Sequence, residues 1–210
     1  MSIQSTIKIK NGELLPLMET FYSIQGEGFH NGKAAYFVRI GGCDVGCCWC
    51  DVKESWNANL HPLTKVEDII QKIDKNKTNT VVITGGEPLM WNMNLLTRIL
   101  HEKGFEIHLE TSGVFPLSGT YNWICLSPKK NQTSLDEIKQ LANELKIIVQ
   151  NKTDLKWAEE QKKDVKKSCK LYLQPEWSKK EVVIPLITDY VMENTDWQVS
   201  LQTHKYMNIP

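Results

Sequence analysis

The sequence predicts an α/β protein in which strand-helix units repeat along the chain. Short runs rich in β-branched and aromatic residues alternate with segments of helical periodicity. No internal repeat, low-complexity tract or Gly/Ser linker interrupts this alternation, so we expect one domain over residues 1–210. Repeated strand-helix order implies parallel strands with right-handed crossovers. Periodicity alone does not separate a partial barrel from a doubly wound sheet.

Seven strands are predicted from these short runs. In chain order they are Ala35 to Ile40, Thr80 to Thr84, Glu106 to Glu110, Trp123 to Leu126, Leu145 to Val149, Lys170 to Leu173 and Trp197 to Leu201. In both candidate folds the functional loops follow the carboxyl ends of the strands. The residues just after these strands are therefore the first candidates for a site.

Helices are predicted between the strands. Three begin with a Ser/Thr-x-x-Glu pattern typical of a capping box: Thr64 ahead of Val66 to Ile73, Ser134 ahead of Ile138, Leu141 and Leu145, and Ser178 ahead of a segment through Val191. Two more span Asn92 to Lys103, stopped by Gly104, and Thr153 to Val165.

The composition excludes several classes of function. Lys+Arg 25 balances Asp+Glu 25, and this zero net charge argues against nucleic acid or an anionic membrane surface as a direct partner. A small neutral or zwitterionic substrate fits better. The N-terminus lacks the apolar run of a signal peptide, and no stretch approaches the ~20 apolar residues that span a bilayer. We therefore expect a cytoplasmic protein with no membrane partner.

Four of the six cysteines, Cys43, Cys47, Cys48 and Cys50, lie within eight positions. The spacing Cys43-x3-Cys47-x2-Cys50 puts three thiolates in one loop, where they can hold three irons of a cubane cluster and leave the fourth iron open. Soft thiolates select iron-sulfur or zinc. A structural zinc site needs a fourth ligand, and Cys48 is too near its neighbours to serve easily. The spacing therefore favours a [4Fe-4S] cluster.

This triad, with Thr84-Gly85-Gly86-Glu87-Pro88, resembles the motifs of the radical S-adenosylmethionine (SAM) superfamily. The open iron chelates the amino and carboxylate groups of SAM, and glycines after a strand let backbone carbonyls approach the ammonium. Glycyl-radical activating enzymes share the cysteine spacing and act on a protein partner. A non-enzymatic zinc or cluster protein is a third reading.

A narrower resemblance covers nearly the whole chain. It rests on Phe21 to Gly28, Phe37 to Arg39, Cys50-Asp51, Trp123 to Lys129, Glu144 to Lys146, Leu173 to Pro175 and Ser200 to Pro210. These segments resemble the 7-carboxy-7-deazaguanine synthases, whose upstream Gln-Gly-Glu-Gly segment and Gln-Thr-His-Lys tail argue against a glycyl-radical activating enzyme.

The resemblance implies a single radical SAM domain over residues 1–210. Its fold would be a shortened, modified partial TIM-type barrel of parallel strands with outer helices, and it would form a homodimer. The implied reaction converts 6-carboxy-5,6,7,8-tetrahydropterin to 7-carboxy-7-deazaguanine with loss of ammonia, for queuosine and other 7-deazapurines. An external one-electron donor reduces the cluster, the adenosyl radical abstracts hydrogen from C6 of the pterin, and SAM is regenerated.

The resemblance also implies site residues. The pterin would be bound by Ile24, Gln25, Gly26, Glu27, Arg39 and Thr84, and by the α-carboxylate of Pro210. SAM would contact Gly86, Ser127, Pro128, Lys129, Gln174, Pro175, Glu176 and Trp177. Gln25 and Glu27 could read the donor and acceptor edge of the pterin, and Arg39 could pair with its carboxylate. No residue is assigned as acid or base.

The magnesium site of the family is altered in this sequence. Family members commonly have Cys-Asp-Thr at the end of the cluster loop, with the threonine hydroxyl ligating Mg²⁺. This chain has Cys50-Asp51-Val52, and valine offers no side-chain oxygen. We expect a weaker dependence on Mg²⁺, which substrate oxygens, water or Asp51 would then have to hold.

Overall fold

The computed structural model describes residues 3–75 and 77–210. Its centre is one sheet in the order β3-β1-β2-β4-β5-β6-β7-β8-β9. The strands are β1 (Leu14–Ile24), β2 (Ala34–Ile40), β3 (Leu63–Lys65), β4 (Thr80–Gly85), β5 (Glu106–Thr111), β6 (Trp123–Leu126), β7 (Glu144–Val149), β8 (Lys170–Pro175) and β9 (Trp197–Val199). The helices are α1 (Ile3–Lys10), α2 (Val66–Gln71), α3 (Asn94–Glu102), α4 (Asp136–Leu141), α5 (Lys152–Lys163), α6 (Lys180–Glu193) and α7 (Thr203–Met207).

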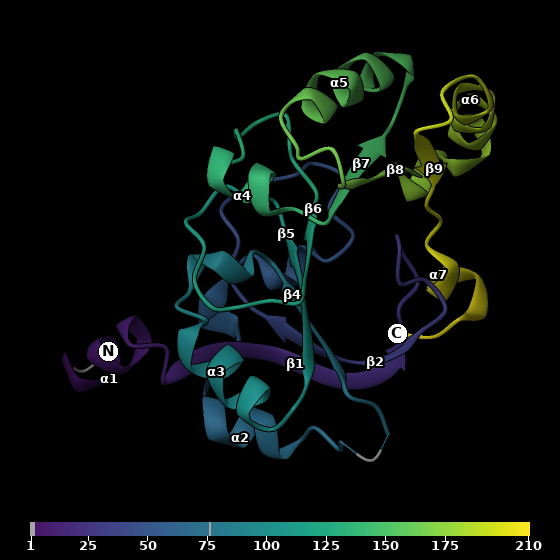
Figure 1. The fold of residues 1–210 in the computed structure, drawn as a ribbon. Coiled ribbons are helices and arrows are strands. Elements are labelled where there is room, and N and C mark those ends of the chain that lie inside the picture. Colours follow the sequence, from purple (N-terminus) through teal and green to yellow (C-terminus); the bar gives the residue numbers. More distant parts are fainter. Residues whose placement is uncertain (1–2, 76) are drawn as a thin grey trace.

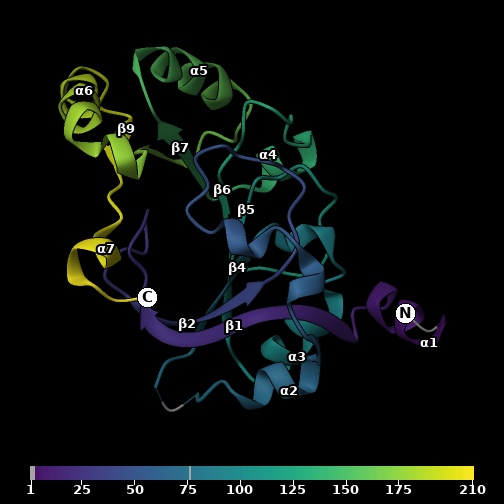
Figure 2. The ribbon, with the colours of Figure 1, turned by 180° about the vertical axis from the view of Figure 1, so that it is seen from behind.

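The sheet curves into an open barrel. From β2 to β9 every neighbouring pair is parallel, and β1 is antiparallel to both β2 and β3. Figures 1 and 2 show α2 to α6 along the outer side of the curved sheet. A doubly wound sheet would carry helices on both faces. The partial barrel with outer helices is therefore confirmed.

All seven predicted strands are present, and β1 and β3 were not predicted. β1 joins β2 by a hairpin without a crossover helix, so strand-helix alternation gives no sign of it. It also contains Pro16, which weakens a strand pattern. α1 and α7, at the two ends of the described chain, were missed as well.

The three predicted capping boxes are wrong, although each helix exists. The residues at the N-caps of α2, α4 and α6 are Lys65, Leu135 and Lys179, and none of them forms a side-chain cap. The hydroxyls proposed as caps donate elsewhere: Thr64 to the carbonyl of Pro62, Ser134 to that of Ser112, and Ser178 to the carboxylate of Glu176.

Two related details of the helix predictions also change. A true capping box occurs at α5, where the Asn151 side chain accepts the Thr153 N–H and Asp154 accepts the Asn151 N–H. Leu145, predicted to follow the helix pattern of α4, belongs to β7, because α4 ends at Leu141. Gly104 does stop α3, with a φ of 74° and its N–H donated to His101.

One face of the sheet is apolar and packs against the helices, whereas the face inside the barrel carries polar and charged side chains. On β5, Ile107 and Leu109 are fully buried in the apolar core. Because side chains alternate along a strand, Glu106, His108 and Glu110 share the opposite face. The inside of the barrel therefore carries charged and polar groups. No helix among the described residues is long and apolar enough to cross a membrane.

Candidate active site

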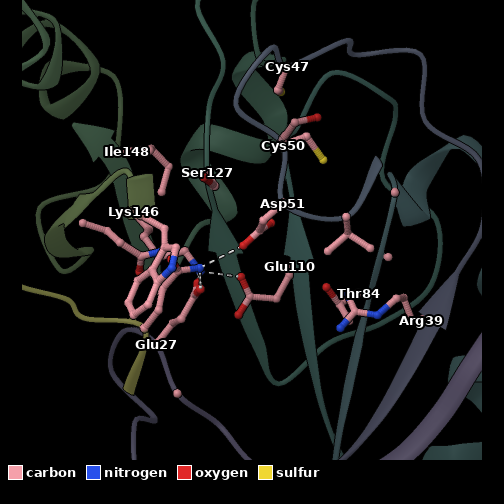
Figure 3. Close-up of a pocket in the computed structure, with 18 of the residues that line it drawn as sticks. Glu27, Arg39, Cys47, Cys50, Asp51, Thr84, Glu110, Ser127, Lys146 and Ile148 are labelled. Carbon is pink, nitrogen blue, oxygen red and sulfur yellow. Dashed lines mark hydrogen bonds and ion pairs between the residues drawn. The ribbon is translucent and has the colours of Figure 1, made fainter. Parts of the chain in front are cut away.

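One pocket lies at the carboxyl ends of the parallel strands (Figure 3). The loops after β2, β4, β5, β6 and β8 open on it, together with the end of β1 and the last residue. Every residue predicted to hold the cluster, SAM or the pterin lines this pocket except Pro128, which is buried between Ser127 and Lys129. Segments far apart in the sequence are thus brought to one site.

The start of the cysteine loop is held by backbone hydrogen bonds to the segment that follows the loop. The N–H groups of Gly42 and Cys43 donate to the carbonyls of Ser55 and Trp56, at 2.6 and 3.1 Å. Gly42 has a φ of 103°, which favours glycine. Cys43, Cys47 and Cys50 line the pocket as half-buried free thiols, whereas Cys48 is exposed and does not line it.

The spacing of the three thiols fits a cluster better than a single ion. Sulfur ligands of one tetrahedral zinc lie roughly 4 Å apart, because each Zn–S bond is about 2.3 Å. Among the described residues, no three cysteines form a group whose sulfur atoms all lie within 4.8 Å of one another. Burial raises the pKa of the Cys43 and Cys47 thiols, so iron binding must displace their protons.

The Gly-Gly-Glu-Pro loop packs directly on the cysteine loop. A Cβ on Gly86 would collide with the carbonyl oxygen of Gly42, so only glycine permits this approach. Glu87 is buried, and its carboxylate accepts the Thr111 hydroxyl at 2.7 Å and the Ser112 N–H at 2.8 Å. Glu87 therefore joins the loops after β4 and β5, and the half-buried Gly86 lines the pocket.

The opposite wall comes from the loops after β6 and β8. Lys129 donates to the Ser127 hydroxyl at 2.7 Å and lies 4.9 Å from the ring centre of Trp49. Burial lowers the pKa of Lys129. Gln174 accepts the Ser200 hydroxyl at 2.7 Å, and Glu176 accepts the Ser178 N–H at 2.9 Å. These two side chains are thus already bound within the chain.

A network of charged and amide side chains, which we name the polar floor, consists of Gln25, Glu27, Glu110, Lys146 and Gln202. The Lys146 ammonium lies between two carboxylates, 2.5 Å from Glu27 and 2.9 Å from Glu110. Gln25 donates to Glu110 at 3.2 Å, and Gln202 donates to Glu27 at 2.9 Å. The floor therefore carries two carboxylates for one ammonium.

Glu27 and Lys146 hold each other in the charged state. Burial alone would raise the pKa of Glu27, but the charge and hydrogen bond of Lys146 outweigh it and lower the pKa to about 2. Burial alone would lower the pKa of Lys146, and the surrounding anionic groups, Glu110 and Glu27 among them, instead raise it well above its usual value. Both groups are therefore charged at neutral pH.

The chain end closes one side of the pocket. After β9, α7 docks on the segment that precedes Glu27, because the Thr203 N–H donates to the Gly26 carbonyl at 2.9 Å. The Ser23 hydroxyl then donates to Pro210 at 2.8 Å. The predicted last strand ends at Val199 rather than Leu201, yet it delivers Pro210 to the pocket as expected.

The comparisons with known proteins agree with one another. A family model described as the radical SAM superfamily matches residues 37–118. The 7-carboxy-7-deazaguanine synthase of Flavobacterium psychrophilum is 58% identical over 204 residues, 97% of each chain. That of Synechocystis is 45% identical, over 92% of this chain and 93% of the relative. The crystal structure of QueE from Escherichia coli matches with a TM-score of 0.80 at 29% identity, covering 95% of this chain and 99% of that one.

The chain belongs to the 7-carboxy-7-deazaguanine synthase family. As a member of the radical SAM superfamily it uses a [4Fe-4S] cluster and SAM. The free thiols of Cys43, Cys47 and Cys50 fit the cluster, and the close approach of Gly86 to the cysteine loop fits SAM bound beside it.

The synthase family resemblance assigned no role in the site to Glu110, Lys146 and Gln202 of the polar floor, although Lys146 and Gln202 lie in segments that carry it. One signal was present in the sequence: Lys146 is a charged residue in the apolar strand Glu144 to Val149, and Glu110 ends a similar strand. A charged side chain at an alternate position of a buried strand points to an interior polar cluster. Its partners come from other strands and could not be chosen from the sequence.

Arg39 lines the pocket of this synthase but already has a partner. Its guanidinium bonds Glu19 at 2.7 Å and lies 5.6 Å from the ring centre of Phe21. Thr84 is opposite Arg39 in the β2–β4 register. The two predicted substrate residues are therefore adjacent, and Arg39 is oriented by an ion pair from β1.

The surroundings of Val52 do not fit the usual magnesium ligation of the synthase family. Val52 lines the pocket without an oxygen to offer from its side chain. The neighbouring carboxylate, Asp51, is bound by Lys205 at 2.7 Å and by Gln202 at 3.1 Å. A cation there would have to compete with the Lys205 ammonium.

Proposed function

We propose that this pocket converts 6-carboxy-5,6,7,8-tetrahydropterin to 7-carboxy-7-deazaguanine with loss of ammonia, in the formation of queuosine or another 7-deazapurine. The observation that carries the proposal is the meeting of the cysteine loop, the Gly-Gly-Glu-Pro loop and the polar floor in one pocket. When bound, the cluster and SAM supply the radical chemistry of the reaction. The residues of this chain bind and orient the reactants.

The cofactor residues in this proposal form one side of the pocket. Cys43, Cys47 and Cys50 would hold the cluster, and the backbone at Gly86 would meet the amino group of SAM. Ser127, Lys129, Pro175 and Trp177 would contact the rest of SAM, with the Gln174 and Glu176 side chains shaping the loop from within. Pro128 would act through backbone position, since its side chain is outside the pocket lining.

The pterin would lie on the polar floor. Two carboxylates against one ammonium leave a net negative charge, which suits the amino and ring N–H donors of a pterin. Ile24, Gly26 and Thr84 would complete the contact surface, with Arg39 at the substrate carboxylate and Pro210 at the donor edge. This arrangement fixes the ring before reaction, which is the protein's main contribution to rate.

Other features of the proposal concern the whole protein. We take residues 1–210 as one radical SAM domain that acts as a cytoplasmic homodimer and receives its electron from an external one-electron donor. Sedimentation of the cluster-loaded protein tests the dimer, and a single species at monomer mass would contradict it.

A binding experiment separates the proposed function from its rivals. With SAM present, 6-carboxytetrahydropterin should raise the Tm of the anaerobic cluster-loaded protein, whereas an activating enzyme for a protein partner would gain nothing from it. Glu110→Gln should weaken pterin binding at least tenfold, because it removes one charge of the polar floor, and Glu160→Gln, at an exposed position of α5, should not. Absence of protection, or zinc in place of iron on metal analysis, would contradict the proposal.

A further inference from the structure

A second cluster of ligating side chains lies away from the pocket. His30 is in the loop after β1, and Glu106 and His108 are near the start of β5. Each offers one ligand atom, and these atoms all lie within 4.8 Å of one another. Glu106 and Glu110 are four residues apart on β5, or about 13 Å along the strand. The cluster is therefore at the opposite end of the barrel interior from the polar floor.

His30 is the unusual member of this cluster. Its side chain is 8% exposed, and its Nε2 has no hydrogen-bond partner, alone among the buried side-chain nitrogens and oxygens of the described residues. The ring lies against Trp123, 4.6 Å between ring centres, and against His108 at 4.1 Å. A buried polar atom without a partner requires an explanation. A ligand bound among these rings would provide one.

We propose that His30, Glu106 and His108 bind one divalent metal ion, Zn²⁺ or an ion with similar ligand preferences. Two imidazoles and a carboxylate suit Zn²⁺, with a fourth position for water on the side of Glu106, which is exposed to solvent.

Ion binding requires two local changes. His108 Nε2 and Glu106 are hydrogen-bonded at 2.9 Å, and the metal would replace this bond while the His108 proton moves to Nδ1. The Lys33 ammonium, 3.1 Å from His30 Nδ1, must turn away when that nitrogen carries the proton. Lys33 is exposed, so it can do so. Lys33 therefore competes with the ion.

The ion would link the loop of residues 25–33, which supplies Gln25 and Glu27 to the polar floor, to strand β5. Residues 25–33 close on themselves, with the Gln25 N–H donating to the Lys33 carbonyl at 2.8 Å. Gln25 and Glu27 of this loop belong to the polar floor, and His30 would tie its far side to β5. The ion would therefore have a structural role: it would hold the loop in place, and none of its three ligands lines the pocket.

Metal titration of the cluster-loaded protein tests the site. The Cys48→Ser background removes an exposed thiol that could bind zinc. After treatment with a chelator, Co²⁺ should bind at one ion per chain beyond the four irons, with visible absorption bands that Zn²⁺ abolishes. His30→Gln and Glu106→Gln should weaken binding at least tenfold. His101→Gln and Glu102→Gln on α3 are matched controls and should change nothing.

One variant separates loss of a ligand from loss of folding. Lys33→Gln removes the competing ammonium, so it should tighten Zn²⁺ binding severalfold, which a folding defect cannot do. The proposal is overturned if no ion binds saturably beyond the irons. Unchanged affinity in both His30→Gln and Glu106→Gln, or weaker affinity in Lys33→Gln, would equally overturn it.

Discussion

The interior carboxylates of the barrel have opposite ionisation behaviour. Glu27 is held ionised by Lys146, whereas Glu144 accepts the Phe29 N–H at 3.2 Å and the Trp123 indole N–H at 3.1 Å and forms no ion pair among the described residues. Burial raises the pKa of Glu144 to about 7, and Lys146 opposes this only in part. One carboxylate therefore stabilises the fold as an anion, and the other is best accommodated with its proton.

A pH-dependent gain in stability should follow from replacing Glu144. The folded protein keeps this proton from the unfolded pKa near 4.5 up to about 7, so stability falls as pH rises through that window. Glu144→Gln should therefore raise the free energy of unfolding by about 3 kcal/mol above pH 7 and change it little at pH 4. Denaturant unfolding at both pH values measures this, with Glu160→Gln as the exposed control. An equal effect at both pH values would refute the assignment.

Trp56 should influence the cluster through Cys50. Its indole N–H donates to the Cys50 sulfur at 3.4 Å. Hydrogen bonds to cluster sulfurs favour the reduced form, so Trp56→Phe should lower the midpoint potential on the order of tens of mV while retaining four irons. A redox titration monitored by electron paramagnetic resonance measures the shift, and Trp157→Phe on α5 is the control. An unchanged potential would show that the contact has no such role.

Because of Val52, we expect turnover to depend only weakly on the concentration of Mg²⁺. Val52 has no side-chain oxygen, and Asp51 is bound by Lys205. Turnover should therefore depend less on Mg²⁺ in this protein than in a relative with a threonine ligand at this position. Initial rates across a Mg²⁺ series measure the dependence, and Val52→Thr should increase it. A strict, saturable requirement at low Mg²⁺ in the unaltered protein would contradict this expectation.

At the scale of elements, the strands were predictable and the helix starts were not. β4 to β8 were visible in the sequence because each is a short run rich in β-branched and other apolar residues, although β5 and β7 also carry interior charges. Capping depends on which acceptor a hydroxyl meets, and Ser134 meets a carbonyl from the loop after β5. Such a contact between distant segments has no local pattern. The antiparallel β1 was missed for a similar reason, since it pairs with β2 through a hairpin.

The chain end offers a test at the level of one element. Residues appended after Pro210 should obstruct the pocket, raising KM strongly or abolishing turnover, because Pro210 lines the pocket beside Ser23. The same residues added before Met1 are the control, since α1 and the chain end lie far apart (Figure 1). Steady-state kinetics at equal iron content measure the effect. Equal kcat/KM for the two tagged proteins would contradict a role for the end of the chain.

At the scale of the whole molecule, the short sequence motifs predicted where the pocket lies. They did not predict which charged side chains pair at its floor. The cysteine spacing and the Gly-Gly-Glu-Pro loop follow strands of one parallel sheet, and topology alone brings them together. The pairing of Lys146 with Glu27 and Glu110 joins β7, β5 and the loop after β1, and depends on barrel curvature. The same curvature gathers His30 and His108, which no sequence spacing indicates.

The most direct test is anaerobic turnover of 6-carboxytetrahydropterin with SAM and a reductant, followed by mass spectrometry. The unaltered protein and Cys48→Ala should both form 7-carboxy-7-deazaguanine with loss of ammonia, while Cys50→Ala, which removes a proposed cluster ligand, should form none. Recovery of the pterin unchanged from unaltered protein that holds four irons per chain would contradict the proposed function.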